Sequence, residues 1–321
     1  MNNVVDTTVH CPVLTFGNVT KGNWEVKDSE YQLGPKIGEG ANAIIHKCQL
    51  SGMTCVAKQL KNGVDAGSQA YKDLVMELEI LTSVQPHPNV VRFWGACIVN
   101  PNSPIIFEEY VDGPTLETYI SSRNGSKLPK PTIFGWSIDL LRALDFLHNR
   151  DPIIIHRDLK PANLMLTKDL QTLKLADFGM SKKVERSQRD TKHHKGYTGT
   201  VRYMAPEVLS QKQGNYNEKA DIFSASLIIW YIATAQRPPG KDLNEIRVSL
   251  QNGTLPKCLH DRPALSAVGW KGLEDIIARM WEHDPGSRPS AMECIDKLNG
   301  LPDKPDISLG VAPKQQCCCV Q

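Results

Sequence analysis

The sequence predicts an α+β fold in which a small antiparallel β-sheet with one helix precedes a larger, mainly helical part. Up to about residue 110, short apolar runs bounded by turn residues read as strands, and only residues 68–83 read as a helix. Beyond that point, apolar residues recur at helical spacing over residues 132–149 and 219–236. The second of these segments is nearly all apolar, and we therefore expect it to be a buried helix.

The first part contains a glycine-rich segment and a strand that ends in a lysine. Residues 37–45 read Ile-Gly-Glu-Gly-Ala-Asn-Ala-Ile-Ile, and glycine lets backbone amides approach phosphate oxygens because no Cβ intervenes. By itself, this segment is equally compatible with an ordinary hairpin turn. A Ser51-Gly52 turn then leads into a strand at 54–58, which ends at Lys58.

Two short polar segments of the second part indicate phosphate chemistry. Residues 156–163 read His-Arg-Asp-Leu-Lys-Pro-Ala-Asn and residues 177–179 read Asp-Phe-Gly, and each follows an apolar run expected to be a strand. One carboxylate can accept a proton from a hydroxyl, while an amide and a second carboxylate can hold metal ions against a polyphosphate. Any one of these residues would ordinarily be a helix cap or a turn residue, but together they favour phosphoryl transfer.

With these motifs, the chain resembles a eukaryotic protein kinase. The resemblance implies the two-lobed protein-kinase fold, with a kinase domain at residues 31–301 that divides into a small lobe, 31–109, and a large lobe, 110–301. Residues 1–30 are then an N-terminal extension, and residues 302–321 are a flexible tail. The resemblance also implies protein substrates, ATP and Mg²⁺, with Mn²⁺ as the alternative ion.

The resemblance assigns a chemical role to each polar residue of the motifs. Asp158 is expected to be the catalytic base, and Lys160 is expected to lie against the transferring phosphate. Asn163 and Asp177 are expected to hold the metal ions. Thr200, in the activation segment, is expected to approach Asp158 and Lys160.

The nucleotide is expected to contact the glycine-rich segment, Lys58 and the hinge between the lobes. Lys58 would anchor the phosphates and pair with Glu77, whereas Glu79 lies about 200° further round the helix and should be solvated. Two residues depart from the family pattern, because Ala43 replaces the third glycine and Val56 stands where alanine is usual. The expected contacts are Ile37, Gly38, Glu39, Gly40, Ala41, Asn42, Ala43, Ile45, Val56, Lys58, Glu109, Val111 and Met165.

One residue before the hinge is expected to gate the back of the nucleotide pocket. If residues 109–111 are the hinge, Glu108 occupies the gate, and a shift of one residue would put Phe107 there instead. The distance from Glu109 to Leu116, where the next helix starts, favours Glu108. A carboxylate at this position needs water or a basic partner.

The activation segment, residues 177–207, is expected to be regulated by phosphorylation. Arg157 lies next to the base, and in the family such an arginine commonly docks a phosphate on this segment. Thr191 and Thr198 are the leading acceptors, and the sequence does not rank them.

Two further carboxylates are expected to hold the large lobe together. The carboxylate of Glu207 should pair with Arg288, because a buried carboxylate needs a fork-shaped cation. The carboxylate of Asp221 should bond to the backbone of the catalytic segment, residues 156–163.

The resemblance favours serine and threonine as acceptors. Kinases of these residues usually carry a lysine two positions after the base, as Lys160 does here, and the chain looks most like the tyrosine-kinase-like branch. Tyrosine stays open as a minor substrate, which would make the enzyme dual-specificity. The alternative is a pseudokinase that serves as a scaffold or nucleotide-binding module, and four departures from the family pattern support it: Ala43, Val56, Glu108 and Ser226.

Composition narrows the remaining classes. A net charge of +2 over 321 residues gives no case for nucleic-acid binding, and no uninterrupted apolar stretch is long enough to span a bilayer. The nine cysteines are scattered singly except at the C-terminal end, which favours a reducing cytoplasm over a disulfide scaffold.

The last residues, Cys-Cys-Cys-Val-Gln, match a prenylation box with Cys318 as its acceptor. A cysteine tail without function is the alternative. One lipid anchors a protein only marginally, so a second acylated cysteine would have to support it. The expectation is peripheral contact with the cytosolic face of a membrane, through the proline-rich tether at 302–313.

Overall fold

The computed structural model describes residues 24–40, 43–61, 68–84, 86–100, 103–186, 200–209, 217–239 and 262–306. The chain divides into two compact units. Unit 1 comprises Met1–Thr82 and Phe93–Glu108, and unit 2 comprises Ser83–Arg92 and Glu109–Gln321. The predicted α+β class is confirmed, because unit 1 is built on a sheet and unit 2 is mainly helical.

Unit 1 is a five-stranded sheet with the strand order β1-β2-β3-β5-β4. Its strands are β1 (Tyr31–Glu39), β2 (Ala43–Leu50), β3 (Met53–Leu60), β4 (Phe93–Cys97) and β5 (Ile105–Glu109). The turn between β2 and β3 has positive φ angles at Ser51 and Gly52, 48° and 83°, which suit the twist of a two-residue hairpin. An apolar cluster covers one face of the sheet and consists of Val26, Cys48, Leu50, Cys55, Ala57, Cys97, Ile105 and Phe107.

The last residues of the predicted extension 1–30 pack on unit 1. The amide of Val26 donates to Ala96 O (2.9 Å), and the amide of Ala96 donates to Trp24 O (2.8 Å), so residues 24–26 run along the edge of β4. Gly95 is required at this crossing because a Cβ there would lie 2.5 Å from Trp24 O. We call residues 24–28 the strap.

The helix of unit 1, α1 (Gln69–Ser83), lies where the sequence predicts it. The hydroxyl of Ser68 accepts from the amide of Tyr71 (3.1 Å) and so caps its first turn. The helix buries apolar side chains along one face, together with the carboxylate of Glu77. Glu79 is half-buried, although we expected it to be solvated, because it lies between the fully buried Leu78 and Ile80.

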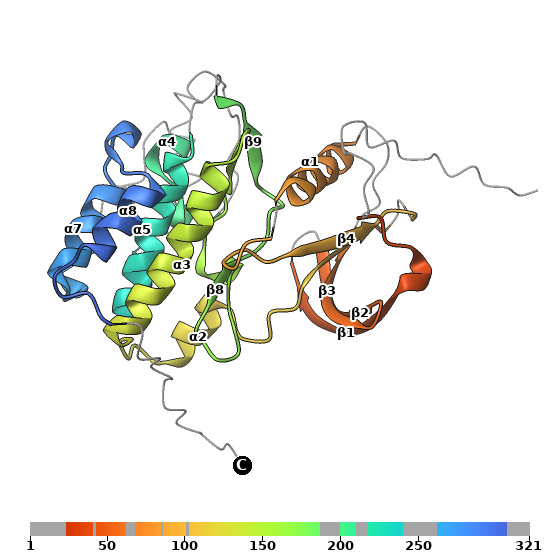
Figure 1. The fold of residues 1–321 in the computed structure, drawn as a ribbon, viewed down its shortest axis with the longest axis horizontal. Coiled ribbons are helices and arrows are strands. Elements are labelled where there is room, and N and C mark those ends of the chain that lie inside the picture. Colours follow the sequence, from red (N-terminus) through yellow and green to blue (C-terminus); the bar gives the residue numbers. More distant parts are fainter. Residues whose placement is uncertain are drawn as a thin grey trace, which may run out of the picture. The chain divides into compact units, whose positions relative to one another are not determined.

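Unit 2 consists of helices with two small two-stranded sheets. Figure 1 shows α3, α5, α7 and α8 packed side by side, and every residue of α5 from Ala220 to Thr234 is buried. The predicted helices at 132–149 and 219–236 appear as α3 and α5. The helices of unit 2 among the described residues are α2 (Leu116–Ser122), α3 (Lys130–His148), α4 (Pro206–Leu209), α5 (Lys219–Thr234), α7 (Lys271–Met280) and α8 (Ala291–Asn299).

The two small sheets carry the catalytic segment. One pairs β6 (Ile153–Ile155) with β9 (Lys182–Val184), and the other pairs β7 (Leu164–Leu166) with β8 (Leu173–Leu175). Residues 156–163 therefore connect β6 to β7, and residues 177–179 follow β8, as the sequence predicts. Both polar segments are thereby held at strand ends.

Two predicted boundaries differ from the structure. The segment Ser83–Arg92 groups with unit 2 and not with the predicted small lobe, because Asn89 Nδ2 donates to Leu173 O (3.0 Å) and the amide of Val91 donates to Leu175 O (2.8 Å). The predicted flexible tail starts too early, since Asp303 accepts from Trp270 Nε1 (3.0 Å) and Lys130 Nζ (3.1 Å). Within the described part of the chain, no helix is long and apolar enough to cross a membrane.

Candidate active site

Asp158 is the centre of a polar cluster in unit 2. Its carboxylate is 6% exposed. Oδ1 accepts from the amide (2.8 Å) and the hydroxyl (3.0 Å) of Thr200, while Oδ2 accepts from Lys160 Nζ (2.5 Å) and Asn163 Nδ2 (3.1 Å). The structure thus brings together four of the predicted site residues. A carboxylate fixed in this way can direct one oxygen at a hydroxyl and accept its proton.

The backbone before Asp158 is fixed from below by α5. Both oxygens of Asp221 accept backbone amides, from His156 (2.8 Å) and Arg157 (3.0 Å), as the sequence predicts. These bonds help to hold Arg157 at a φ of 70°, a conformation that non-glycine residues rarely adopt. Burial opposes ionisation, but the hydrogen bond and the charge of His148 hold the pKa of Asp221 below its ordinary value.

His148 is a site residue that the sequence analysis missed. Its Nε2 lies 3.0 Å from Asp221 Oδ2, at the end of α3. No pattern in the chain points to it, because a histidine in the last turn of a helix usually interacts with the helix dipole. Its role becomes visible only when α3 and α5 pack together.

Asn163 and Asp177 present oxygen atoms that suit a magnesium ion. The amide of Ala176 donates to Asn163 O (2.9 Å), which brings the two side chains into neighbouring positions. Asn163 Nδ2 donates to Asp158, while its Oδ1 accepts no hydrogen bond from the described residues. One amide oxygen and one carboxylate fit Mg²⁺, which usually keeps waters and phosphate oxygens as its other ligands.

In unit 1, Lys58 Nζ lies 2.8 Å from Glu77 Oε1, and both side chains are largely buried. The expected ion pair between β3 and α1 is therefore present. Val56 is on the same face of β3 as Lys58, two residues earlier, and Ala43 is buried where β2 begins.

The glycine-rich segment is braced by charges. The amide of Gly40 donates to Ala43 O (2.8 Å), which closes the turn between β1 and β2. Glu39 accepts from Lys36 and from Lys61 (2.5 Å), and these bonds lower its pKa to about 2. Gly38 lies opposite Ile45 in the strand register, and Ile37 is exposed, whereas Ala41 and Asn42 lie outside the described residues.

Phe107 and Glu108, the two candidate gate residues, lie on opposite faces of β5. Phe107 is fully buried in the apolar cluster that also contains Cys55 and Ala57, and its ring centre lies 5.0 Å from that of Tyr31. Side chains alternate along a strand, so Glu108 is on the opposite face, which is also the face of Lys58. This placement favours Glu108 as the gate residue, and the assignment stays a prediction.

The remaining predicted contacts belong to unit 2. Glu109 pairs with Lys174 (2.8 Å) and accepts the amide of Arg92 (3.2 Å), so its side chain is committed to structure. Val111 is buried, and Met165 is half-buried beside Thr115, with which it forms a β-bridge.

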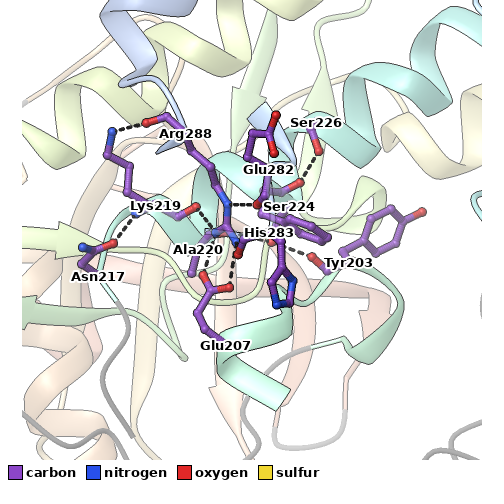
Figure 2. Close-up of polar contacts among 11 residues, drawn as sticks. Tyr203, Glu207, Asn217, Lys219, Ala220, Ser224, Ser226, Glu282, His283 and Arg288 are labelled. Carbon is purple, nitrogen blue, oxygen red and sulfur yellow. Dashed lines mark hydrogen bonds and ion pairs between the residues drawn. The ribbon is translucent and has the colours of Figure 1, made fainter. Parts of the chain in front are cut away.

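Figure 2 shows the pair that closes the activation segment, with Arg288 directed at Glu207. Nη1 and Nη2 of the guanidinium lie 2.6 and 2.8 Å from the two carboxylate oxygens of Glu207, as the sequence predicts. Arg288 is 1% exposed, and its other N–H groups donate to the carbonyls of Glu282, Lys219 and His283. All donors of this buried cation are therefore satisfied.

The regulatory residues are only partly described. Ser181, a hydroxyl near the start of the activation segment, is buried and donates to His156 O (3.3 Å), which argues against it as a phosphate acceptor. Thr191 and Thr198 lie outside the described residues, as does Cys318.

The chain is similar in sequence to known protein kinases. A family model described as "Protein kinase domain" matches residues 31–298. Serine/threonine-protein kinase STY46 of Arabidopsis thaliana is 32% identical over 303 residues, which are 94% of this chain and 48% of that protein. Mitogen-activated protein kinase kinase kinase 7 of Homo sapiens is 30% identical over 284 residues, 86% of this chain and 43% of that protein. The chain thus spans about half the length of these curated relatives.

Proposed function

Because the chain belongs to the protein kinase domain family, we propose that it transfers the γ-phosphate of ATP to serine and threonine hydroxyls of proteins. The observation that carries this proposal is the Asp158 carboxylate, which is buried and fixed by Thr200, Lys160 and Asn163. Relatives whose names describe serine/threonine kinases support the same acceptor class.

Asp158 orients the acceptor hydroxyl and accepts its proton as the new phosphate ester forms. Lys160 already lies against that carboxylate, where its ammonium group can neutralise charge on the transferring phosphoryl group. Lys58 of unit 1, positioned by Glu77, binds the nucleotide phosphates. Asn163 Oδ1 and Asp177 would hold the divalent ion, Mg²⁺ or Mn²⁺, which neutralises the phosphate oxygens.

The acceptor preference rests on Thr200 and Lys160. The hydroxyl of Thr200 and the ammonium group of Lys160 both donate to the Asp158 carboxylate. An acceptor hydroxyl must therefore approach that carboxylate between these two groups. A short aliphatic hydroxyl fits this requirement, and tyrosine remains the minor alternative.

Phosphate incorporation into a peptide library that contains serine, threonine and tyrosine tests the function. Asp158→Asn keeps the shape of the side chain but removes the base, and we expect it to lower kcat by roughly 10²- to 10⁴-fold. Equal incorporation by wild type and variant would contradict the proposal. Binding of magnesium and ATP without turnover by the wild type would favour the scaffold alternative.

We propose that phosphorylation of Thr191 or Thr198 raises this activity by docking on Arg157. The support is the position of Arg157, whose backbone is fixed next to Asp158 by Asp221. Mass spectrometry of the autophosphorylated enzyme identifies the acceptor, and Arg157→Gln should then remove the activation while unphosphorylated activity persists.

We also propose that Cys318 is prenylated and brings the kinase to a cytosolic membrane face. The support is the sequence Cys319-Val320-Gln321 that follows Cys318, together with the adjacent Cys317. Membrane partitioning in cells measures this, and a Cys318→Ser variant that partitions like the wild type refutes it.

A further inference from the structure

Arg202 is a cation that lacks a carboxylate partner within the described parts of the chain. It follows Thr200 in the short 3-10 turn Val201–Tyr203 and is half-buried. Its Nη1 donates to the carbonyl oxygen of Pro238 at 2.5 Å. A guanidinium has five N–H donors, so one carbonyl leaves most of its hydrogen-bonding capacity available.

The contrast with Arg288 is informative. Arg288 is buried in the same unit, and Glu207 neutralises it through two hydrogen bonds. Arg202 is only half-buried, but partial removal from water still favours a counter-ion for a guanidinium. Arg202 is therefore poised for a negative group that the chain itself does not supply in its described residues.

A second arginine lies beside it. Arg237 directly precedes Pro238, so the bond from Arg202 brings that guanidinium next to the backbone that carries Arg237. Arg237 pairs with Glu117 of α2 through Nη2, and its side chain is 62% exposed. The pair with Glu117 is neutral overall, so Arg237 contributes by cancelling a carboxylate that would otherwise repel an anion near Arg202.

The backbone of Arg202 is close to the Asp158 carboxylate. Thr200 donates two hydrogen bonds to Asp158, and Arg202 is only two residues further along the chain. Two residues of extended chain span at most about 7 Å. An anion bound by Arg202 would therefore belong to a residue that closely flanks the acceptor.

We propose that Arg202 and Arg237 form an anion-recognising subsite that selects protein substrates with an acidic side chain beside the acceptor serine or threonine. This inference rests on the proposed kinase function. The planar guanidinium matches a carboxylate through two parallel hydrogen bonds, which provides both attraction and register. Arg202 makes the direct contact, and Arg237 strengthens it electrostatically.

The test uses the full chain and three synthetic peptides that share one acceptor serine and differ only in flanking residues, which are glutamate, glutamine or lysine. We expect kcat/KM for the glutamate peptide to exceed that for the glutamine peptide by roughly tenfold, as for a charge-assisted contact. Arg202→Gln should lose most of this preference and Arg237→Gln a smaller part. Arg279→Gln, an exposed arginine of α7, is the matched control and should retain it.

A second variant at the same position controls for misfolding of Arg202→Gln. Arg202→Lys retains the charge but not the fork, and we expect it to keep a reduced preference with an unchanged Tm. If Arg202→Gln lowers activity on all three peptides equally, the arginine holds the fold or a phosphate of its own activation segment, and the inference is overturned. A wild type that autophosphorylates but treats the peptides alike overturns the inference alone. Absence of any phosphoryl transfer overturns the proposed function with it.

Discussion

Glu77 in unit 1 and Asp158 in unit 2 are both carboxylates beside a lysine, but they are held in different ways. Asp158 accepts hydrogen bonds from Thr200 and Asn163 as well as from Lys160. Glu77 accepts from Lys58 as its one polar partner among the described residues. Unit 2 thus holds the Asp158 carboxylate through a network of donors, whereas the Glu77 carboxylate of unit 1 depends on one described donor.

Buried ion pairs of unit 2 should contribute more to the stability of the fold than exposed ion pairs. Glu207→Ala leaves the fully buried Arg288 without its carboxylate, and we expect the free energy of unfolding to fall by about 3–5 kcal/mol. Denaturant titration measures this change. Asp275→Ala, which removes an exposed partner of Lys271, is the control and should change it by less than about 0.5 kcal/mol. Comparable losses in the two variants would contradict the contrast between buried network and surface pair.

The stability of unit 1 depends on the close approach of the strap backbone to Gly95. In Gly95→Ala, the new Cβ would meet Trp24 O, and we expect a loss of about 1–3 kcal/mol with faster hydrogen exchange over residues 24–28. Gly135→Ala is the matched control, because nothing lies within 4 Å of a Cβ there and the residue is inside α3, where alanine is favoured. Unchanged hydrogen exchange in Gly95→Ala would mean that contact with the strap is not the reason for a glycine at position 95.

The single contact of Glu77 should affect activity more than stability. We expect Glu77→Gln to lower kcat/KM by about tenfold, because Lys58 loses its charged partner, and to change the unfolding free energy by only about 1 kcal/mol. Steady-state kinetics at varied ATP concentration measure the first effect. Glu79→Gln on the same helix is the comparison, and an equal loss of activity there would refute the choice of Glu77.

The smallest expected effect is a change in how the free energy of unfolding depends on acidic pH. Asp221 has a pKa below its ordinary value of 3.8 in the folded protein, so its contribution to stability is present above that pH and is lost as the pH falls through the folded pKa. Asp221→Asn should therefore be less stable at neutral pH and show a flatter decline of stability in acid. Unfolding free energies measured at several pH values below about 5 check this, and parallel curves for both proteins would contradict it.

Much of the catalytic segment could be predicted because its residues are close in the chain. Asp158, Lys160 and Asn163 fall within one short connection between β6 and β7, so their spacing already places them together. The pairing of Glu207 with Arg288 was also predictable, since a buried carboxylate requires a fork-shaped donor. The start of the strap and the grouping of Ser83–Arg92 were not, because hydrogen bonds to β4 and β8 decide them.

From the amino-acid sequence alone we could predict the α+β class, the main helices and the candidate site residues, because local periodicity and short motifs encode these directly. Only the tertiary structure decided that Glu108 shares a face with Lys58, that His148 supports Asp221, and that Arg202 meets the carbonyl next to Arg237. Each of these depends on packing between residues far apart in the chain. Local patterns cannot specify such packing, because its energy arises only when distant surfaces exclude water together.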